Sequence, residues 1–184
     1  MGVGPSRLSE NIQLYLGSIR DATDKKKLSG AEITHLVSIL SEKQSSSLDK
    51  SKNDKFTETL STTRCKRFLI TEEDQKQTNI SKYFSMTSEF IHEGLWIDNG
   101  NLLGKKMISK RGLKLSSVHC MMGKSRSATI STAYLCTITG LSWLTVLNSL
   151  RSCREVVNPN EGFKEQLRLY EESGGFEVIL FLFA

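Results

Sequence analysis

The segment from His119 to Ser127 constrains the fold most, because it must join the end of a buried strand to the start of a helix within a few residues. Cys120 opens the segment, and Arg126 stands near its end. The residues between them are Met121, Met122, Gly123, Lys124 and Ser125. A loop of this length can curl until its N–H groups converge on one point and form a nest for an oxyanion. The planar guanidinium of Arg126 suits two oxygens of a phosphate. We therefore predict a phosphate site over residues 121–126, with Cys120 at its base.

The same surroundings favour a reactive form of Cys120. A free thiol has a pKa near ~8.5 and is mostly protonated at neutral pH. Converging N–H groups, an arginine and a helix N-terminus can lower that pKa to roughly 3.5–7.5. Apolar residues recur at helical spacing after Arg126, so we predict a helix whose positive end points at the phosphate. A structural cysteine that happens to precede an arginine is the competing interpretation, and Gly123 together with Ser125-Arg126-Ser127 disfavours it.

On these residues the chain resembles the protein tyrosine phosphatase superfamily, whose signature is His-Cys-x5-Arg-Ser/Thr. The ending Ser125-Arg126-Ser127 is similar to that of the small atypical dual-specificity phosphatases. Residues 67–84 resemble the family's strand, acid loop and helix, and residues 158–167 resemble a later family segment. The resemblance covers residues 10–173 as one catalytic domain. It implies hydrolysis of phosphotyrosine and phosphoserine or phosphothreonine on proteins, through a cysteinyl-phosphate intermediate and without a metal or cofactor.

The resemblance also implies a role for each matching residue of the loop. Cys120 is expected to attack phosphorus, and Arg126 to bind the phosphate and stabilise its charge. Ser127 is expected to donate a hydrogen bond to the sulfur and to help it leave in the second step. His119 is expected to orient the loop rather than to exchange protons, and Asn158 to brace the loop.

Asp74 occupies the family position of the general acid. It lies ten residues before Phe84, in the family register, although Thr71 stands where relatives often have proline. The alternative is an ordinary solvated loop carboxylate. His35 and His92 are interpreted as strand and helix residues rather than as catalytic ones.

Strands that alternate with helices predict an α/β fold of three layers, with a central, mostly parallel sheet flanked by helices on both faces. The predicted strands cover residues 11–17, 33–40, 66–70 and a segment that ends at His119. The predicted helices cover residues 21–29, 81–94, 127–139, 142–152 and 160–172. For the helix at 81–94 we expect Gly94 as the C-cap and a broad apolar face that includes Met86.

Two insertions interrupt the family pattern. Residues 41–63 are rich in Ser, Thr, Lys and Asp and are predicted to form a long flexible loop. Residues 104–117 stand directly before the catalytic strand, and joining Leu103 to Val118 would restore a family-like strand. Either this segment is a real surface loop whose last residues replace the start of the strand, or it is translated intron or a splice variant, which we favour.

Composition limits the partners. The net charge is +5, but residues 104–117 contribute five basic residues and no acidic ones, so the rest of the chain is neutral and gives no sign of a nucleic-acid surface. Four cysteines without metal or disulfide spacing, and no signal peptide, fit a reducing, cytoplasmic location. Residues 1–9 are predicted to be flexible, and Gly2 with Ser6 fits the N-myristoylation pattern. A single myristoyl chain would give weak association with the inner face of the plasma membrane, and Lys25-Lys26-Lys27 either add attraction to anionic lipid or form an ordinary solvated helix face.

The apolar tail at 174–184 has too few residues to span a bilayer, and its role stays open. The leading functional hypothesis is a protein phosphatase, with MAP-kinase pathway proteins as substrates expected from the family alone. A catalytically weak or inactive phospho-binding scaffold is the second hypothesis, because the insertion at 104–117 interrupts the catalytic strand. A phosphoinositide phosphatase is the third, because Lys124 adds positive charge to the loop.

Overall fold

The computed structural model describes residues 6–7, 14–24, 26, 33–47, 65–97 and 115–176. The predictions for Gly2, for Lys25 and Lys27, and for residues 48–63, 104–114 and 177–184 lie outside the described residues.

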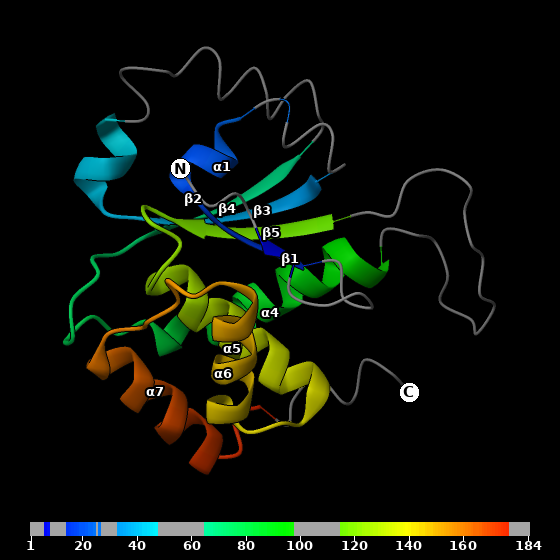
Figure 1. The fold of residues 1–184 in the computed structure, drawn as a ribbon, viewed down its shortest axis with the longest axis vertical. Helices are drawn as coiled ribbons and strands as arrows, with labels where there is room; N and C mark the ends of the chain where they lie inside the picture. The colour runs from blue at the N-terminus through cyan, green and yellow to red at the C-terminus, as the bar shows by residue number, and fades with distance from the viewer. Residues whose placement is uncertain are drawn as a thin grey trace.

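The described strands form one sheet in the order β1-β2-β5-β3-β4. Their bounds are Ser6–Arg7 for β1, Leu14–Ser18 for β2, Ile33–Leu40 for β3, Lys66–Thr71 for β4 and Leu115–Cys120 for β5. Strands β2, β5, β3 and β4 run parallel, and β1 pairs antiparallel with β2. Because parallel strands share one direction, the carboxyl ends of β2 to β5 meet at one edge of the sheet (Figure 1).

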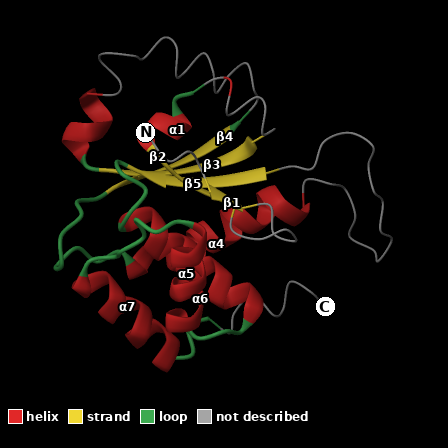
Figure 2. Ribbon diagram, in the orientation of Figure 1, coloured by secondary structure: helices red, strands yellow, loops and turns green. Residues whose placement is uncertain are grey.

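Helices cover the sheet on both sides (Figures 1 and 2). One side carries α4 (Phe84–His92), α5 (Arg126–Thr139), α6 (Trp143–Cys153) and α7 (Glu161–Glu172). The other side carries the short α1 (Ile19–Ala22) and a helical segment at residues 42–47. The predicted three-layer α/β fold is therefore confirmed.

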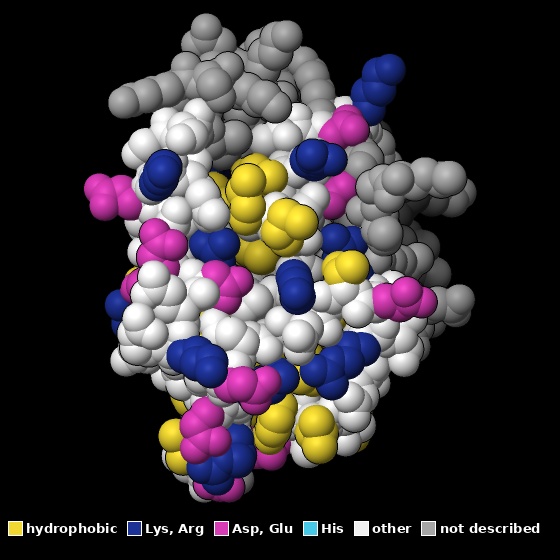
Figure 3. Space-filling model, turned by 60° about the vertical axis from the view of Figure 1, so that its left-hand side comes forward, with side chains coloured by type: hydrophobic (Ala, Val, Ile, Leu, Met, Phe, Trp, Pro, Cys, Tyr) yellow, Lys and Arg dark blue, Asp and Glu magenta, His cyan; other side chains and the backbone are white. Residues whose placement is uncertain are grey.

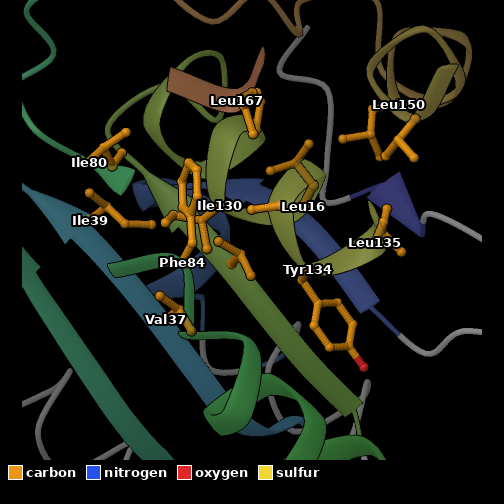
Figure 4. Packing of buried hydrophobic residues seen from close by; sticks show 14 of the residues in the cluster. Leu16, Val37, Ile39, Ile80, Phe84, Ile130, Tyr134, Leu135, Leu150 and Leu167 are labelled. Carbon is orange, nitrogen blue, oxygen red and sulfur yellow. The ribbon is translucent and has the colours of Figure 1, made fainter. Parts of the chain in front are cut away.

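Strand β3 shows why both faces must be covered. Val37 and Ile39 pack into the large core between the sheet and α4–α7, whereas Leu36 and Leu40 pack into a smaller cluster on the other face. All four side chains are fully buried, as the two-residue period of a central parallel strand requires. Figure 4 shows the larger core, in which Phe84 of α4 and Ile130 of α5 lie near Val37 and Ile39.

Helix α5 runs through the middle of this core and is buried along most of its length. Burial deprives the hydroxyl groups of its threonines of water as a hydrogen-bond partner. Thr129, Thr132 and Thr137 each donate to the carbonyl four residues earlier, at 2.8–2.9 Å. The helix can therefore be buried on all sides while satisfying these polar groups.

The structure corrects two details of the predicted helix at 81–94. Helical backbone begins as the 3-10 turn η1 (Ser81–Tyr83) and continues past Gly94 as the π-helical segment η2 (Glu93–Ile97). A Cβ atom at position 94 would lie 2.5 Å from the His35 ring, so the glycine permits close packing and does not end the helix. Met86 is 47% exposed, and Thr87 and Ser88 take its expected place in the buried face.

The prediction of a loop from residue 41 is wrong for residues 42–47. Residues 42–47 form a helical segment that begins at a capping box: Gln44 N–H donates to Ser41 Oγ, and Ser41 N–H donates to Gln44 Oε1. The motif Ser-x-x-Gln was present in the sequence but lay inside a polar run.

The observed bounds of other elements differ from the predicted ones by a few residues. Helix α1 begins at Ile19, two residues before the helix predicted at 21–29, and ends at Ala22; Lys26 is helical, and residues 25 and 27–29 lie outside the described residues. Residues 6–7, expected to be flexible, form β1 on the sheet edge. Within the described ranges, no helix has the length and apolar content needed to cross a bilayer.

Candidate active site

Strand β5 delivers Cys120 to the middle of the edge where the parallel strands end. It lies between β2 and β3 and pairs with both from residue 116 to Cys120. Ser116 and Ser117, the last residues of the second insertion, belong to this strand and are buried. Ser116 Oγ donates to Ile91 O at 3.2 Å, so its hydroxyl is satisfied inside the core. In open parallel sheets, ligands bind at this edge, where the chain connections diverge to either side.

The carbonyl groups of residues 121–124 all accept hydrogen bonds from segments outside the loop. Met121 O accepts from the backbone N–H of Ile19 at 3.3 Å, and Lys124 O accepts from that of Asn158 at 2.9 Å. Between them, Met122 O and Gly123 O accept from the Arg154 guanidinium at 3.3 and 3.2 Å. Since the N–H of each trans peptide points opposite to its C=O, the following N–H groups turn inward, as an oxyanion nest requires.

Gly123 is required by both space and conformation. Its φ is +67°, in the left-handed region that favours glycine. A Cβ atom there would lie 2.5 Å from the carbonyl oxygen of Gly17, at the end of β2. The loop is thus seated directly on the neighbouring strand end.

Cys120 is 1% exposed at the base of the loop. Burial by itself raises the pKa of its thiol. The Ser127 hydroxyl, 3.2 Å from Sγ, opposes this together with the backbone N–H groups of Ser127 and Lys124 and the charge of Arg126. The sum holds the pKa of Cys120 below the ordinary thiol value, so the site favours the thiolate.

The other buried cysteines behave in the opposite way. Burial raises the pKa of Cys65 to about 11 and, with a smaller contribution from Glu171, that of Cys136 to about 12. Cys153, the last residue of α6, is exposed. Cys120 is thus set apart from the buried Cys65 and Cys136 by its surroundings.

His119 lies under the loop and is fully buried. Its Nε2 is 2.7 Å from Ser38 Oγ, which also accepts from Arg67 Nε at 2.9 Å. Burial, and next the charge of Arg67, lower the pKa of His119 to about 3. The ring is therefore neutral at physiological pH and lies where it can orient the strand end.

Arg126 is the first residue of α5 and is 3% exposed. Its Nη1 donates to the backbone oxygen of Glu72 at 2.9 Å and to Gln44 Oε1 at 3.1 Å. Its Nε–H makes no hydrogen bond to the described part of the chain. The guanidinium is thus fixed through one nitrogen, and Nε–H remains available to an anion in the nest.

Asp74 lies over the loop in the segment that follows β4. Its Oδ1 accepts from Ser125 Oγ at 2.6 Å and from Asn160 Nδ2 at 2.8 Å. Its Oδ2 faces Arg126 Nε at 3.9 Å. The carboxylate is therefore held by one oxygen, with the other directed toward the arginine that would bind the phosphate.

The start of α7 explains the segment at 158–167. Asn160 caps the helix by accepting from Phe163 N–H at 3.0 Å, while its amide group holds Asp74. Gly162 permits contact with the acid loop, since a Cβ atom there would lie 1.9 Å from Lys76 O. Gln166 Oε1 accepts from the N–H groups of Ile80 and Ser81 at 2.8 and 2.9 Å. One helix terminus thus fixes the acid loop against the phosphate loop.

The structure brings together every predicted site residue that it describes: Cys120, the loop residues 121–125, Arg126, Ser127, His119, Asp74 and Asn158. Asn158 contacts the loop through its backbone N–H. Sequence reasoning missed Gln44, Arg154 and Asn160, whose contacts join segments far apart in the chain. The Ser41-x-x-Gln44 box and the position of Asn160 at the start of a predicted helix gave local signals, whereas Arg154 gave none. Among the described residues, no group of three His, Cys, Asp or Glu side chains could hold a metal ion.

Comparison with known proteins agrees with this geometry. Residues 14–173 match the family model described as "Dual specificity phosphatase, catalytic domain". The chain is 34% identical over 154 residues to Dual specificity protein phosphatase 15 of Mus musculus, covering 84% of this chain and 53% of the relative. It is 30% identical over 172 residues to Dual specificity protein phosphatase 22 of Homo sapiens, covering 94% and 76%.

A crystal structure of DUSP15 superposes with a TM-score of 0.69 at 31% identity, covering 92% of this chain and 88% of that one. The chain spans about half the length of the phosphatase 15 relatives it matches in mouse and rat. The family model, however, covers most of the chain, from β2 to the end of α7. The chain belongs to the dual-specificity phosphatase family.

Proposed function

We propose that the chain hydrolyses phosphotyrosine and phosphoserine or phosphothreonine on proteins through a cysteinyl-phosphate intermediate. The observation that carries the proposal is the geometry of residues 120–126: a thiol with a lowered pKa lies at the base of a loop whose carbonyls at residues 121–124 accept hydrogen bonds from the surrounding segments. Membership of the dual-specificity family supports phosphoprotein substrates.

In the first step, the Cys120 thiolate forms a bond to phosphorus while the bond from phosphorus to the substrate oxygen breaks. The inward N–H groups and Arg126 stabilise charge on the three non-bridging oxygens. Asp74 donates a proton to the departing oxygen. Its free oxygen, Oδ2, lies on the side of Arg126, where the leaving group would stand.

In the second step, a water molecule attacks phosphorus and gives its proton to the Asp74 carboxylate. The bond from phosphorus to sulfur breaks, and inorganic phosphate leaves. The Ser127 hydroxyl, 3.2 Å from Sγ, stabilises the departing thiolate. His119 supports the loop from below and, with its pKa lowered to about 3, takes no proton.

Turnover of p-nitrophenyl phosphate and of a tyrosine-phosphorylated peptide tests the proposal. We expect both activities in the native chain and neither in Cys120→Ser. Full activity of Cys120→Ser would end the proposal. Tight binding of phosphopeptides without turnover would favour the phospho-binding scaffold instead.

The contacts of β5 bear on the scaffold alternative. The strand pairs on both sides through to Cys120, and the buried Ser116 hydroxyl has an acceptor. The insertion therefore leaves the end of the catalytic strand held in the sheet, which supports an active enzyme. Parallel assays on phosphopeptides and phosphoinositides distinguish a lipid phosphatase, the third hypothesis.

We also propose N-myristoylation at Gly2, a cytoplasmic protein that associates weakly with the inner face of the plasma membrane, and substrates among MAP-kinase pathway proteins. The support is the Met1-Gly2 start with Ser6, and the family. One myristoyl chain gives an association constant on the order of 10⁴ M⁻¹, which permits exchange with the cytoplasm. Labelling with a myristate analogue tests the site; incorporation that persists in Gly2→Ala would refute it.

A further inference from the structure

A depression of 650 Å³ opens directly beside the phosphate loop, between the start of α1 and the segment at 154–158. We call it the flanking groove. It shares Met121, Met122 and Lys124 with the loop, so it directly adjoins the place where a substrate phosphate would bind. Its volume is within the range of roughly 300–1,000 Å³ that is usual for ligand sites.

The walls of the flanking groove are largely apolar and accessible. Met121, Met122 and Val156 are 40%, 67% and 43% exposed, and Ile19 also lines the groove. Figure 3 shows a group of hydrophobic side chains on this side of the molecule, with Lys and Arg side chains around it. Methionine side chains are flexible and polarisable, so they can adapt to apolar side chains of different shapes.

The cation deepest in the groove is already engaged. Arg154 is 4% exposed, and its guanidinium donates to the carbonyls of Met122 and Gly123. Withdrawing it to bind an anion would release the two carbonyls that orient the nest. Asp21 is also buried, with its carboxylate accepting from the N–H and hydroxyl of Ser18 at 2.9 and 2.8 Å.

The charges left at the rim are of both signs: Arg20 and Lys124 are positive, Glu155 is negative, and all three are exposed. Such a rim offers no concentrated positive field for a second phosphate. The groove therefore combines apolar walls with a mixed, solvated edge, the arrangement that suits an uncharged side chain.

We propose that the flanking groove binds an aliphatic side chain of the substrate polypeptide, close in sequence to the phosphorylated residue. The proposal rests on the phosphatase function proposed above. An extended chain advances about 3.3–3.6 Å per residue, so the side chain would come from within roughly three positions of the phosphorylated residue. The groove then selects substrates by an apolar neighbour instead of a second phosphate.

The test uses phosphotyrosyl peptides that differ at one flanking position at a time, carrying Leu, Ala, Asp or phosphoserine. We expect kcat/KM to be about tenfold higher for Leu than for Ala at one position. Val156→Asp should remove this preference and leave p-nitrophenyl phosphate turnover unchanged. Leu144→Asp, at a similarly exposed site near the start of α6 and outside the groove lining, is the matched control and should keep the preference.

Peptide binding to Cys120→Ser provides a measurement that needs no turnover. The same ranking in Kd supports the groove even if the native chain proves to be a phospho-binder. A ranking led by phosphoserine, or no difference among the four peptides in either measurement, overturns the groove. Absence of p-nitrophenyl phosphate turnover in the native chain counts against the proposed function and not against the groove.

Discussion

At the scale of single residues, the lowered pKa of Cys120 depends strongly on one hydroxyl. Ser127 contributes both its side chain and its backbone N–H, and these lead the effects that oppose burial. A hydrogen bond to a charged group contributes about 1.5–3 kcal/mol, and each pKa unit corresponds to about 1.4 kcal/mol. Removing the hydroxyl should therefore raise the pKa of Cys120.

In Ser127→Ala we expect the acidic limb of the kcat/KM profile to move upward by about one pH unit or more. The sign follows from the thiolate, whose population rises with pH through the pKa, so a higher pKa leaves less thiolate at any lower pH. The pH dependence of alkylation by iodoacetamide measures the same shift. Ser131→Ala is the control on the same helix, because Ser131 Oγ has no hydrogen bond to the described residues. Identical profiles for Ser127→Ala and the native chain would remove Ser127 from this role.

Asn160 performs two tasks that substitution can separate. Serine at this position can still cap α7 but cannot reach Asp74, whereas alanine does neither. Both variants should slow turnover of substrates with poor leaving groups by about tenfold, since Asp74 loses a donor 2.8 Å from Oδ1. Only Asn160→Ala should lower the free energy of unfolding, by about 1 kcal/mol. The measurements are kcat across a series of aryl phosphates and the free energy of unfolding in denaturant. A decrease in kcat of Asn160→Ser that is the same for good and poor leaving groups would contradict the account.

At the scale of elements, two glycines with nearly the same backbone conformation form a matched pair. Gly123 and Gly140 have φ values of 67° and 66°. A Cβ atom at Gly140, the C-cap of α5, would meet nothing within 4 Å, whereas one at Gly123 would meet the backbone of Gly17. Both alanine variants should therefore lose about 1 kcal/mol of stability from the left-handed conformation. Only Gly123→Ala should also lose activity, by about 10²-fold, because it displaces the loop. Equal activities in the two variants would show that the loop tolerates displacement.

Elements with a strong local pattern were predicted well. Strand β3 was predicted at 33–40, its observed range, because its apolar residues fall on both sets of alternating positions, which is typical of a strand covered on both faces. The helix predicted at 142–152 also begins where expected, because Ser142 is the N-cap of α6 and accepts from Thr145 N–H. The loop from Cys120 to Arg126 was recognised because its residues are adjacent in the sequence.

Features that depend on tertiary contact were not predictable. The sequence suggested that Gly94 ends a helix, but a glycine is needed there because the side chains of His35 and Ser116 leave no space for a Cβ atom. Arg154 gave no local signal, since its partners lie about thirty residues earlier. The origin of residues 104–117 stays a prediction: β5 includes residues 115–117, as expected if the insertion supplies the start of the strand. Abundant transcript encoding residues 104–117 would exclude the intron hypothesis.

At the scale of the whole molecule, the site joins the carboxyl ends of β2, β3, β4 and β5 to the starts of α5 and α7. The single side chain of Arg126 contacts both the segment after β3, through Gln44, and the segment after β4, through Glu72. An anion bound in the nest should therefore stabilise the whole fold. Ligand at a hundred times its Kd adds about 2.7 kcal/mol to the free energy of unfolding.

Vanadate should therefore raise the Tm of the native chain, and inorganic phosphate should do so at higher concentration. Arg126→Lys should abolish most of the increase, because lysine cannot reproduce the planar fork. Cys153→Ser, at an exposed position on α6, is the control and should respond like the native chain. Equal responses from the native chain and Arg126→Lys would place the anion elsewhere.

The claim that Cys120 carries the phosphoryl group can be tested directly by mass spectrometry. Asp74→Asn should retain attack on a substrate with a good leaving group but slow the attack of water, so the intermediate should accumulate. After an acid quench during turnover of p-nitrophenyl phosphate, we expect one phosphoryl group on the peptide that contains Cys120, and none in the double variant with Cys120→Ser. The account would be contradicted if the chain turns over substrate and the phosphoryl group is found on another residue, or if Cys120 is never modified during turnover.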